Sequence, residues 1–550
     1  MRRFSSIDFM RGFAIWMMVI FHVIMRWYDH DWVGDGEFEG APAAVLAIFV
    51  LILYFTAWAG FFLLVSSIGN MISMYRNLER GKSWKKVMMF QVVGGLLLLG
   101  AAVLVESTIG YHAYAGELVM GRPEKWHMIL WRGYHMETIH TIALCVIVNG
   151  IVQGLLARNG GHRKVKRNIQ VYALLAGLSI AFTGPVYKVL RMIVPGYPNA
   201  TWESSLAGKL DVQYAVLGES SIGDIILRGV MFPFGGNPEP LFPYLALSFI
   251  GSIIGIYLCQ RRCPRKMPRN GIIIALSTAF VGLAGTIIVL LLGQADPEQL
   301  IDNFFQIPGL YPGLWLWWFL FLVGGQLALV LLIIRLVEFR GRGRSFGRKT
   351  LAWRRYGYVA FTIYTYQFID VVPRLLYQLF PDLSRIWPYP ERMDWLPVLV
   401  LIPTTLLLWE VVLRLWEKIE YAGGMEWCLA KITERLLPGR RDFTKGKKRW
   451  WQAARLDARE YLYKPEWLDI VKRSEMDREG KEDSKLSLIL AISGVMFFPL
   501  AFLGIAISRA ARRDEGKNGL NTVAFYLSVG SLMIYTILWA LLFLIPLPEI

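Results

Sequence analysis

Residues 9–27 read FMRGFAIWMMVIFHVIMRW, an apolar run that carries only a few titratable side chains. About 20 apolar residues are enough for one helix to cross the ~30 Å hydrocarbon layer of a membrane. Similar runs recur along all 550 residues, of which 55% are hydrophobic and only 18% are charged. This composition predicts an all-α, polytopic membrane bundle of about 12 transmembrane helices. The twelve candidate spans begin near Phe9, Ala43, Val87, Thr138, Ile169, Leu241, Gly271, Leu314, Tyr356, Leu396, Leu486 and Thr522.

The first run is expected to stay in the membrane rather than to be cleaved as a signal peptide. It has the length of a full span, it contains Arg11, and no small-residue cleavage site follows it. The net charge of +17 does not indicate a nucleic-acid partner, because the basic residues gather in short loops between the spans. In that place they set the topology and contact anionic membrane lipids.

The loops between the spans alternate in charge, which assigns them to the two sides of the membrane. An excess of Lys and Arg marks cytoplasmic loops. The chain is therefore expected to start in the cytoplasm and to lie in the plasma membrane, with the acidic or mixed segments outside. One loop does not fit, because residues 511–518 are basic but fall outside if there are twelve spans. Either the last pair of spans is inverted or one span is miscounted. The cytoplasmic loops are 76–86, 158–167, 261–269 and 339–349.

Three parts of the chain are expected from this pattern. Residues 1–416 form a ten-helix membrane core, which carries all the candidate functional residues. Residues 417–485 are a charged, amphipathic cytoplasmic insert with helices suited to the lipid interface. Residues 486–550 form a C-terminal pair of transmembrane helices, to which we assign no chemistry because its apolar runs contain no ionisable residue.

Arg11 and His22 are the sharpest candidates, because an ionisable residue inside a span is costly and often functional. Eleven residues make about three helical turns, so the two side chains share one helix face, ~16 Å apart. Asp8 is three residues before Arg11 and can pair with it. The alternative is structural: Arg11 reaches lipid phosphates as an anchor, and His22 bonds a neighbouring helix.

Three further residues are candidates on the outer side. His140 lies one turn into the fourth span, at a depth that His22 can share, and Glu239 lies between two prolines at the mouth of the bundle. His30 lies in an acidic outer loop, where a solvated histidine is the simpler interpretation. His22 and His140 would also suit haem ligation, which we favour less. No metal site is expected, because the spacing offers no convincing third ligand.

The opening of the chain resembles the first helix of the transmembrane acyltransferase superfamily, which includes the heparan-α-glucosaminide N-acetyltransferase family and the integral-membrane type-three acyltransferases. The pair Arg11 and His22 is similar to the paired Arg and His of the type-three branch. The segment ETIHTIAL places His140 on the His of a family motif, and the residues before Glu239 resemble the family's Asp-Pro-Glu. The Ser-hydrophobic-Asp-x-x-Arg-Gly opening of the family is matched by Ser6, Ile7, Asp8, Arg11 and Gly12.

The resemblance extends in organisation over about the first 416 residues and implies a function. It implies an acetyl-CoA-dependent acyltransferase that moves an acetyl group from the cytoplasm to a hydroxyl or amine of a sugar or glycan outside. The donor is acetyl-CoA, and the acceptor is an extracytoplasmic glycan or glycolipid. A homodimer is left open.

The resemblance also implies roles for the candidate residues. His22 would take the acceptor's proton, and a covalent acetyl-histidine is the alternative route. Glu239 or His140 would orient His22 or bind the acceptor, and His30 is the alternative base. Arg11, whose guanidinium Asp8 would fix, would hold the phosphates of acetyl-CoA together with Arg354 and Arg355.

Two other classes of protein compete with the acyltransferase. A solute transporter or channel would use Arg11 and His22 as a substrate or proton relay. It ranks second, because the sequence shows no inverted repeat or paired Gly-interrupted spans. An assembly protein that docks through the charged insert would leave Arg11 and His22 unexplained.

Overall fold

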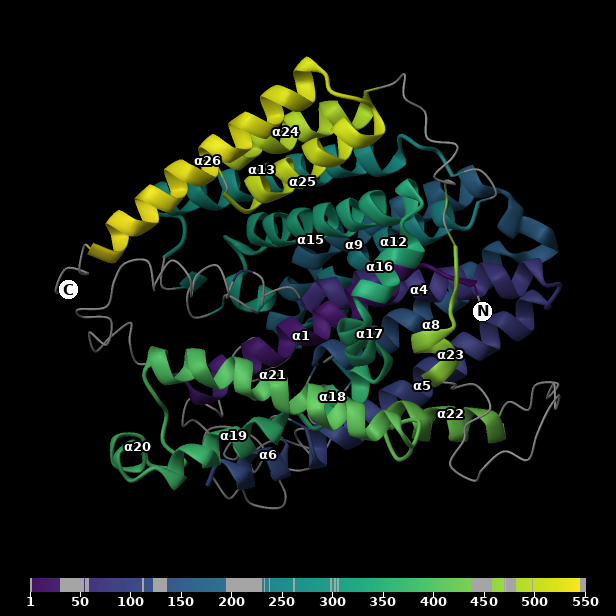
Figure 1. Ribbon diagram of the computed structural model, residues 1–550. Helices are drawn as coiled ribbons and strands as arrows, with labels where there is room; N and C mark the ends of the chain where they lie inside the picture. The colour runs from purple at the N-terminus through teal and green to yellow at the C-terminus, as the bar shows by residue number, and fades with distance from the viewer. Residues whose placement is uncertain are drawn as a thin grey trace.

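A computed structural model shows a bundle of helices (Figure 1). His30, one of the predicted catalytic residues, lies outside the residues that the structure describes. The described residues are 2–29, 54, 59–110, 113–121, 136–193, 230–231, 233–236, 238–260, 263–296, 299–300, 303, 306–436, 458–468, 470, 481–496 and 498–544.

Long apolar helices dominate the described residues, and nine of them are long and apolar enough to cross a membrane. This confirms the predicted all-α, polytopic membrane fold. A tenth helix, α4 (Ala59–Glu79), belongs to the second predicted span and packs along α12. The nine are α1 (Ser5–Trp27), α5 (Trp84–Thr108), α8 (Thr138–Leu156), α9 (Val165–Ile193), α12 (Leu241–Leu258), α13 (Met267–Leu291), α15 (Trp315–Val337), α21 (Trp395–Glu417) and α26 (Gly519–Leu544).

The remaining elements are short and connect or cover these helices. They include a pair of two-residue strands, which joins the start of the chain to the predicted insert. They are α6 (Tyr114–Val119), η1 (Arg158–Arg163), η3 (Ile307–Leu310), η4 (Glu338–Arg340), α16 (Gly343–Lys349), η6 (Tyr377–Leu379), α20 (Pro381–Ile386), α22 (Met425–Leu436), α23 (Ala458–Tyr463), β1 (Arg2–Arg3) and β2 (Glu466–Trp467).

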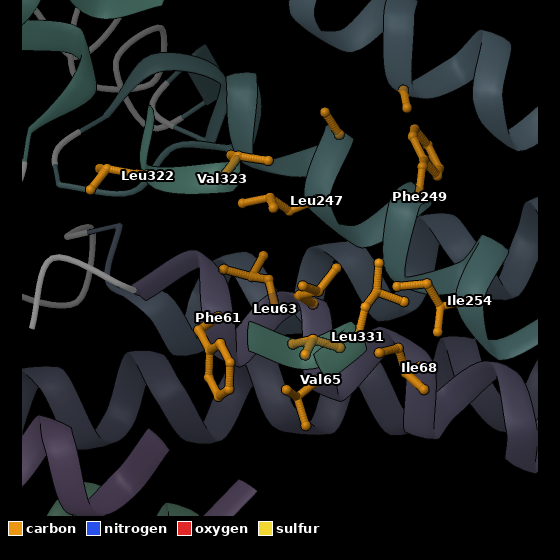
Figure 2. Close-up of a cluster of buried hydrophobic side chains, with 14 of the residues drawn as sticks. Phe61, Leu63, Val65, Ile68, Leu247, Phe249, Ile254, Leu322, Val323 and Leu331 are labelled. Atoms are coloured by element: carbon orange, nitrogen blue, oxygen red, sulfur yellow. The ribbon is translucent and has the colours of Figure 1, made fainter. Parts of the chain in front are cut away.

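The largest apolar core lies where α4, α12 and α15 meet (Figure 2). Branched and aromatic side chains from the three helices interlock there, among them Leu63, Phe249 and Leu331. Helices that pack this closely inside a membrane are held by van der Waals contacts rather than by exclusion of water. Two of the helices that form this core, α4 and α15, also pack against α1.

Helix α1 runs through the middle of the bundle, between α15 and α21 in the view of Figure 1. It contacts α4, α15, α16 and α21, and most extensively a helix that begins at Leu351. A Cβ atom at Gly12 would overlap the carbonyl oxygen of Trp353, and the amide of Gly357 lies close by. Only glycine allows the two backbones to approach this closely. The Gly after Arg11 thus fixes α1 against this segment.

That segment corrects one of the twelve predicted spans. Instead of one long helix from Tyr356, the chain crosses beside α1 in short pieces: α17 (Leu351–Tyr358), α18 (Ala360–Thr365), η5 (Gln367–Asp370) and α19 (Val371–Leu376). Its first piece lies against Gly12 near the start of α1, and Asp370 reaches Arg26 near the end, at 2.9 Å. Broken backbone at membrane depth is tolerated only inside protein or beside a cavity.

A carboxylate from the predicted insert holds the break. Glu426 of α22 accepts hydrogen bonds from the amides of Phe361 at 2.6 Å and Thr362 at 3.3 Å. These amides belong to the first turn of α18, where a helix has no internal partners for them. The span was predicted as one helix because this partner lies about 65 residues along the chain and leaves no trace in the local pattern.

The span predicted from Leu486 is also wrong as a single helix. The structure has two helices there, α24 (Glu482–Met496) and α25 (Phe498–Asp514), packed side by side with α26 (Figure 1). Gly494 lies against Ala501, and Gly504 against Ala491, so the two helices run antiparallel as a hairpin. At 1.5 Å per residue, each is about 22 to 26 Å long, shorter than the hydrocarbon layer.

The hairpin returns the chain to the end of the bundle where it started. Asp483 at its start and Asp514 at its end both pair with Arg340. The basic residues 511–518 therefore join the basic loop 339–349, and the conflict in the predicted topology disappears. Of the two explanations given above, the hairpin supports the second: one span was miscounted, and the last pair need not be inverted.

We call the two ends of the bundle the basic end and the opposite end. At the basic end the Arg76 guanidinium lies 5.8 Å from the Phe4 ring, and β1 of the N-terminus pairs with β2. The described part of the insert thus covers the start of α1. At the opposite end the Met393 amide donates to the carbonyl of Trp27 at 2.8 Å. The domain boundaries at 416 and 485 remain predictions.

Candidate active site

Arg11 lies at the basic end with an exposed side chain, although α1 is otherwise mostly buried. Asp8, one turn earlier, is buried and pairs with Arg3 at 3.7 Å, with Arg11 within electrostatic range. Arg11 also lies within electrostatic range of Glu426, the carboxylate that holds α18. An exposed guanidinium at this place is free to meet the phosphates of a ligand from solution.

Arg354 and Arg355 lie nearby but are engaged by the protein itself. Arg354 is 1% exposed and donates to the carbonyls of Gly347 at 2.9 Å and Leu462 at 3.1 Å. Arg355 pairs with Glu410 at 3.0 Å and Glu417 at 2.7 Å. These contacts bind the insert to the core, so Arg11 is the more available of the three predicted phosphate ligands.

Three glutamates gather at the opposite end, and we call Glu106, Glu137 and Glu239 the acid cluster. Glu106 comes from the last turn of α5, Glu137 precedes α8, and Glu239 precedes α12. Tyr364 of α18 connects them, since it hydrogen-bonds to Glu106 and lies within electrostatic range of the other two. Glu106 and Glu239 are only 2% and 7% exposed.

Two hydrogen bonds hold the backbone of Glu239 against the segment that contains His140. The Glu239 amide donates to the Met136 carbonyl at 3.0 Å, and the Thr141 hydroxyl donates to the Glu239 carbonyl. His140 precedes Thr141 and is 2% exposed. The structure therefore brings together two of the predicted site residues that lie about 100 positions apart in the sequence.

Burial favours the protonated forms of two carboxyl groups in the acid cluster, those of Glu137 and Glu239. Burial raises the pKa of Glu137 to about 7. Burial, and next the neighbouring charge of Glu137, raise the pKa of Glu239 well above its ordinary value. Two nearby carboxyl groups resist being ionised together. The pair Glu137 and Glu239 thus favours a bound proton.

His22 lies one turn after Met18 on the same face of α1. Met18 packs against the apolar cluster to which Val105, Ile139 and Tyr364 belong. Val105 precedes Glu106 in the sequence, Ile139 precedes His140, and Tyr364 hydrogen-bonds to Glu106. Arg26, one turn later, is within electrostatic range of His22 and pairs with Asp370. The α1 face that carries Arg11 at the basic end thus also carries Met18, which packs beside neighbours of the acid cluster, and His22.

Sequence reasoning missed Glu106, Glu137 and Tyr364. Glu106 had a detectable signal, because an ionisable residue in the last turn of an apolar helix is a candidate by default. Tyr364 had none, since its helix was predicted as part of one unbroken span. Within the described residues, no group of three or more His, Cys, Asp or Glu side chains is placed to hold a metal ion.

A comparison with known families matches residues 3–177 to the family described as heparan-alpha-glucosaminide N-acetyltransferase, catalytic. The matched part contains Arg11, His22, Glu137 and His140, and it ends before Glu239. A comparison with curated proteins found no match. The two ends of α1 and two of the three acid-cluster residues thus lie inside the matched region.

Proposed function

We propose that this chain, whose residues 3–177 belong to the heparan-alpha-glucosaminide N-acetyltransferase catalytic family, transfers acetyl groups across the membrane that holds it. Acetyl-CoA binds at the basic end, and a hydroxyl or amine of a sugar or glycan receives the acetyl group at the opposite end. One observation carries this proposal: one face of α1 presents exposed Arg11 at the basic end, then Met18, which packs beside neighbours of the acid cluster, and then His22.

The donor site uses the charge of the basic end. Coenzyme A has phosphates at one end and its thioester at the other, so its phosphates stay near Arg11 while the thioester reaches along α1. Asp8 fixes the first turn of the helix through Arg3. Arg354 and Arg355 shape the mouth and add positive charge, with Arg11 making the larger phosphate contact.

The transfer itself needs a base beside the acceptor. The acceptor's oxygen or nitrogen attacks the carbonyl carbon of the thioester, and His22 takes the proton that the acceptor loses. The C–S bond then breaks, the acetyl group stays on the acceptor, and the imidazolium returns the proton to the leaving thiolate. His140 and Glu239 bind the acceptor's polar groups and hold it in position.

Calorimetry on the purified protein with acetyl-CoA tests the donor assignment. The proposal predicts saturable binding of acetyl-CoA and of coenzyme A, because both carry the phosphates. It also predicts acetylation of an added amino sugar, detected by mass spectrometry. A solute transporter or channel would show neither saturable coenzyme A binding nor acetylated sugar, and this result would reject the acetyltransferase.

Cysteine labelling in intact cells tests the orientation. We expect the basic end in the cytoplasm, since loops rich in Lys and Arg stay there. Ser345 at the basic end and Asp382 of α20 at the opposite end both lie in short surface helices. A membrane-impermeant maleimide should modify Asp382→Cys but not Ser345→Cys until the cells are opened. The reverse pattern would show that the basic end faces outside and would contradict the expected orientation.

A further inference from the structure

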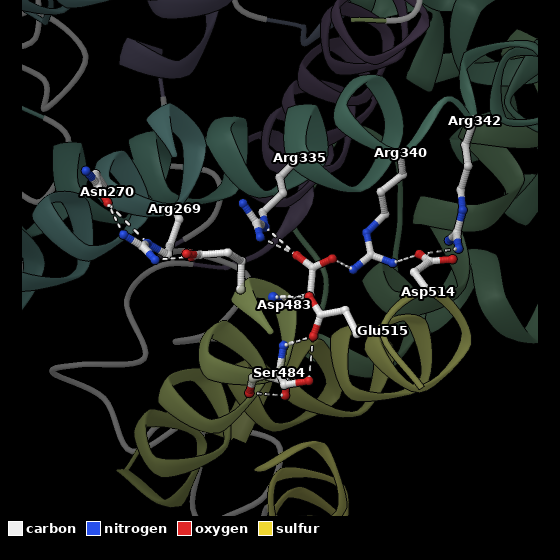
Figure 3. A network of polar contacts seen from close by, with 11 residues as sticks. Arg269, Asn270, Arg335, Arg340, Arg342, Asp483, Ser484, Asp514 and Glu515 are labelled. Atoms are coloured by element: carbon white, nitrogen blue, oxygen red, sulfur yellow. Dashed lines mark hydrogen bonds and ion pairs between the residues drawn. The ribbon is translucent and has the colours of Figure 1, made fainter. Parts of the chain in front are cut away.

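Four buried charged residues join the C-terminal hairpin to the end of α15 (Figure 3), and we call them the clamp network. The Arg335 Nε atom donates to Asp483 at 2.8 Å, and Arg340 pairs with both Asp483 and Asp514. None of the four side chains is more than 10% exposed. Removing one partner from a buried ion pair leaves a charge without compensation, so such a network resists separation.

The segment that this network holds also holds the start of α1. Glu338 lies between Arg335 and Arg340 in the sequence and is 0% exposed. Its carboxylate accepts hydrogen bonds from the Ser6 amide at 2.9 Å and the Ser6 hydroxyl at 2.8 Å. A carboxylate is favoured at a helix N-terminus, where the amides have no internal partners. Glu338 thus anchors the turn that leads to Arg11.

We propose that the hairpin α24–α25 is a clamp that positions the donor-binding end of α1 through Glu338. Asp483 and Asp514 are positioning residues, because they occupy the two arginines that flank Glu338. Arg335 is three residues before Glu338, a spacing at which helical side chains meet. Without Asp483, Arg335 turns to Glu338 and draws its carboxylate away from Ser6. The part of this proposal that concerns acetyl-CoA rests on the proposed function.

Hydrogen exchange tests the clamp without any ligand. In the full-length Asp483→Asn/Asp514→Asn protein, amides of residues 5–12 should exchange about fivefold faster or more, the lower limit of typical coupling between sites. Glu482→Gln is the matched control, because it removes the neighbouring but more exposed ion pair between Arg269 and Glu482. The side chains of these two residues are 21% and 31% exposed. It should leave residues 5–12 unchanged. Unchanged exchange in the double variant, with normal exchange in α12, would overturn the clamp.

Glu338→Gln keeps the proposal testable if the double variant does not fold. It leaves the hairpin intact and should speed exchange in residues 5–12 alone; protection equal to the wild type would overturn the clamp as well. If Arg11 holds the donor, both variants should also raise the KM for acetyl-CoA about fivefold or more with kcat within about twofold. A wild-type protein that binds no acetyl-CoA would reject the proposed function, while the exchange result still decides the clamp.

Discussion

The protein buries two groups of charged residues, and they differ in what surrounds each charge. In the clamp network, the guanidinium groups of Arg335 in α15 and Arg340 in η4 meet carboxylates of the hairpin, so each charge faces its opposite. In the acid cluster, Glu239 faces Glu137, a group of the same charge. Opposite charges fix a structure, whereas like charges compete for a proton. The comparison suggests that the first group holds the fold and the second serves the chemistry.

Replacing His22 should have the largest effect on turnover. His22→Ala should lower acetyl transfer about a hundredfold or more, the usual loss for a general base, while acetyl-CoA affinity stays near the wild-type value. His30→Ala should do less, because His30 stands between Asp29 and Asp31 in the sequence, where we expect a solvated histidine. Turnover at saturating donor measures both. Near-normal rates for His22→Ala beside an inactive His30→Ala would move the base to the loop.

Glu239→Gln should reduce turnover by about tenfold to a hundredfold, since the amide keeps the shape of the side chain but replaces the carboxyl group that binds the acceptor's polar groups. This variant tests directly whether the acid cluster takes part in chemistry. Asp382→Asn, an exposed change at the same end of the bundle, is its control and should leave the rate unchanged. Full activity of Glu239→Gln would make the acid cluster structural, and the contrast with the clamp network would fail.

Arg11→Ala should weaken acetyl-CoA binding about tenfold, because one charge-assisted contact to a phosphate contributes roughly 1.5–3 kcal/mol at most. The maximal rate should change much less than the affinity. Arg163→Ala removes an exposed arginine from another basic loop and controls for overall charge. Calorimetry on the two variants compares them with the wild type. Equal affinities for wild type and Arg11→Ala would remove Arg11 from the donor site.

The smallest expected effect is on the pH dependence of stability. Burial raises the pKa of Glu137 from its ordinary value of 4.5 to about 7 in the folded protein, so its protonated form stabilises the fold. The free energy of unfolding should therefore fall between pH 4.5 and 7, by up to about 3 kcal/mol from this residue. Glu137→Gln should remove this fall. Apparent Tm values at pH 5 and pH 8 measure it, and identical pH profiles would contradict the shift.

The sequence predicted the parts of the molecule that depend on local pattern. The apolar lengths of α1, α13 and α15 need no distant partner, and the shared face of Arg11 and His22 follows from helical spacing alone. The failures have distant causes. Glu426 holds the break before α18, and Asp483 with Asp514 returns the hairpin to the basic end, through contacts that no local window contains. Of the three acid-cluster residues only Glu239 was predicted, for its place between two prolines, whereas Glu106 and Glu137 were not.

Reconstituted vesicles test the central claim most directly. Purified protein is inserted with the basic end outward, labelled acetyl-CoA is supplied only outside, and glucosamine is trapped inside as the acceptor. Because acetyl-CoA cannot cross the bilayer, labelled N-acetylglucosamine inside the vesicles requires transfer along α1. The account predicts this product for the wild type and its near absence for His22→Ala. Vesicles that bind no acetyl-CoA and form no product inside would contradict it.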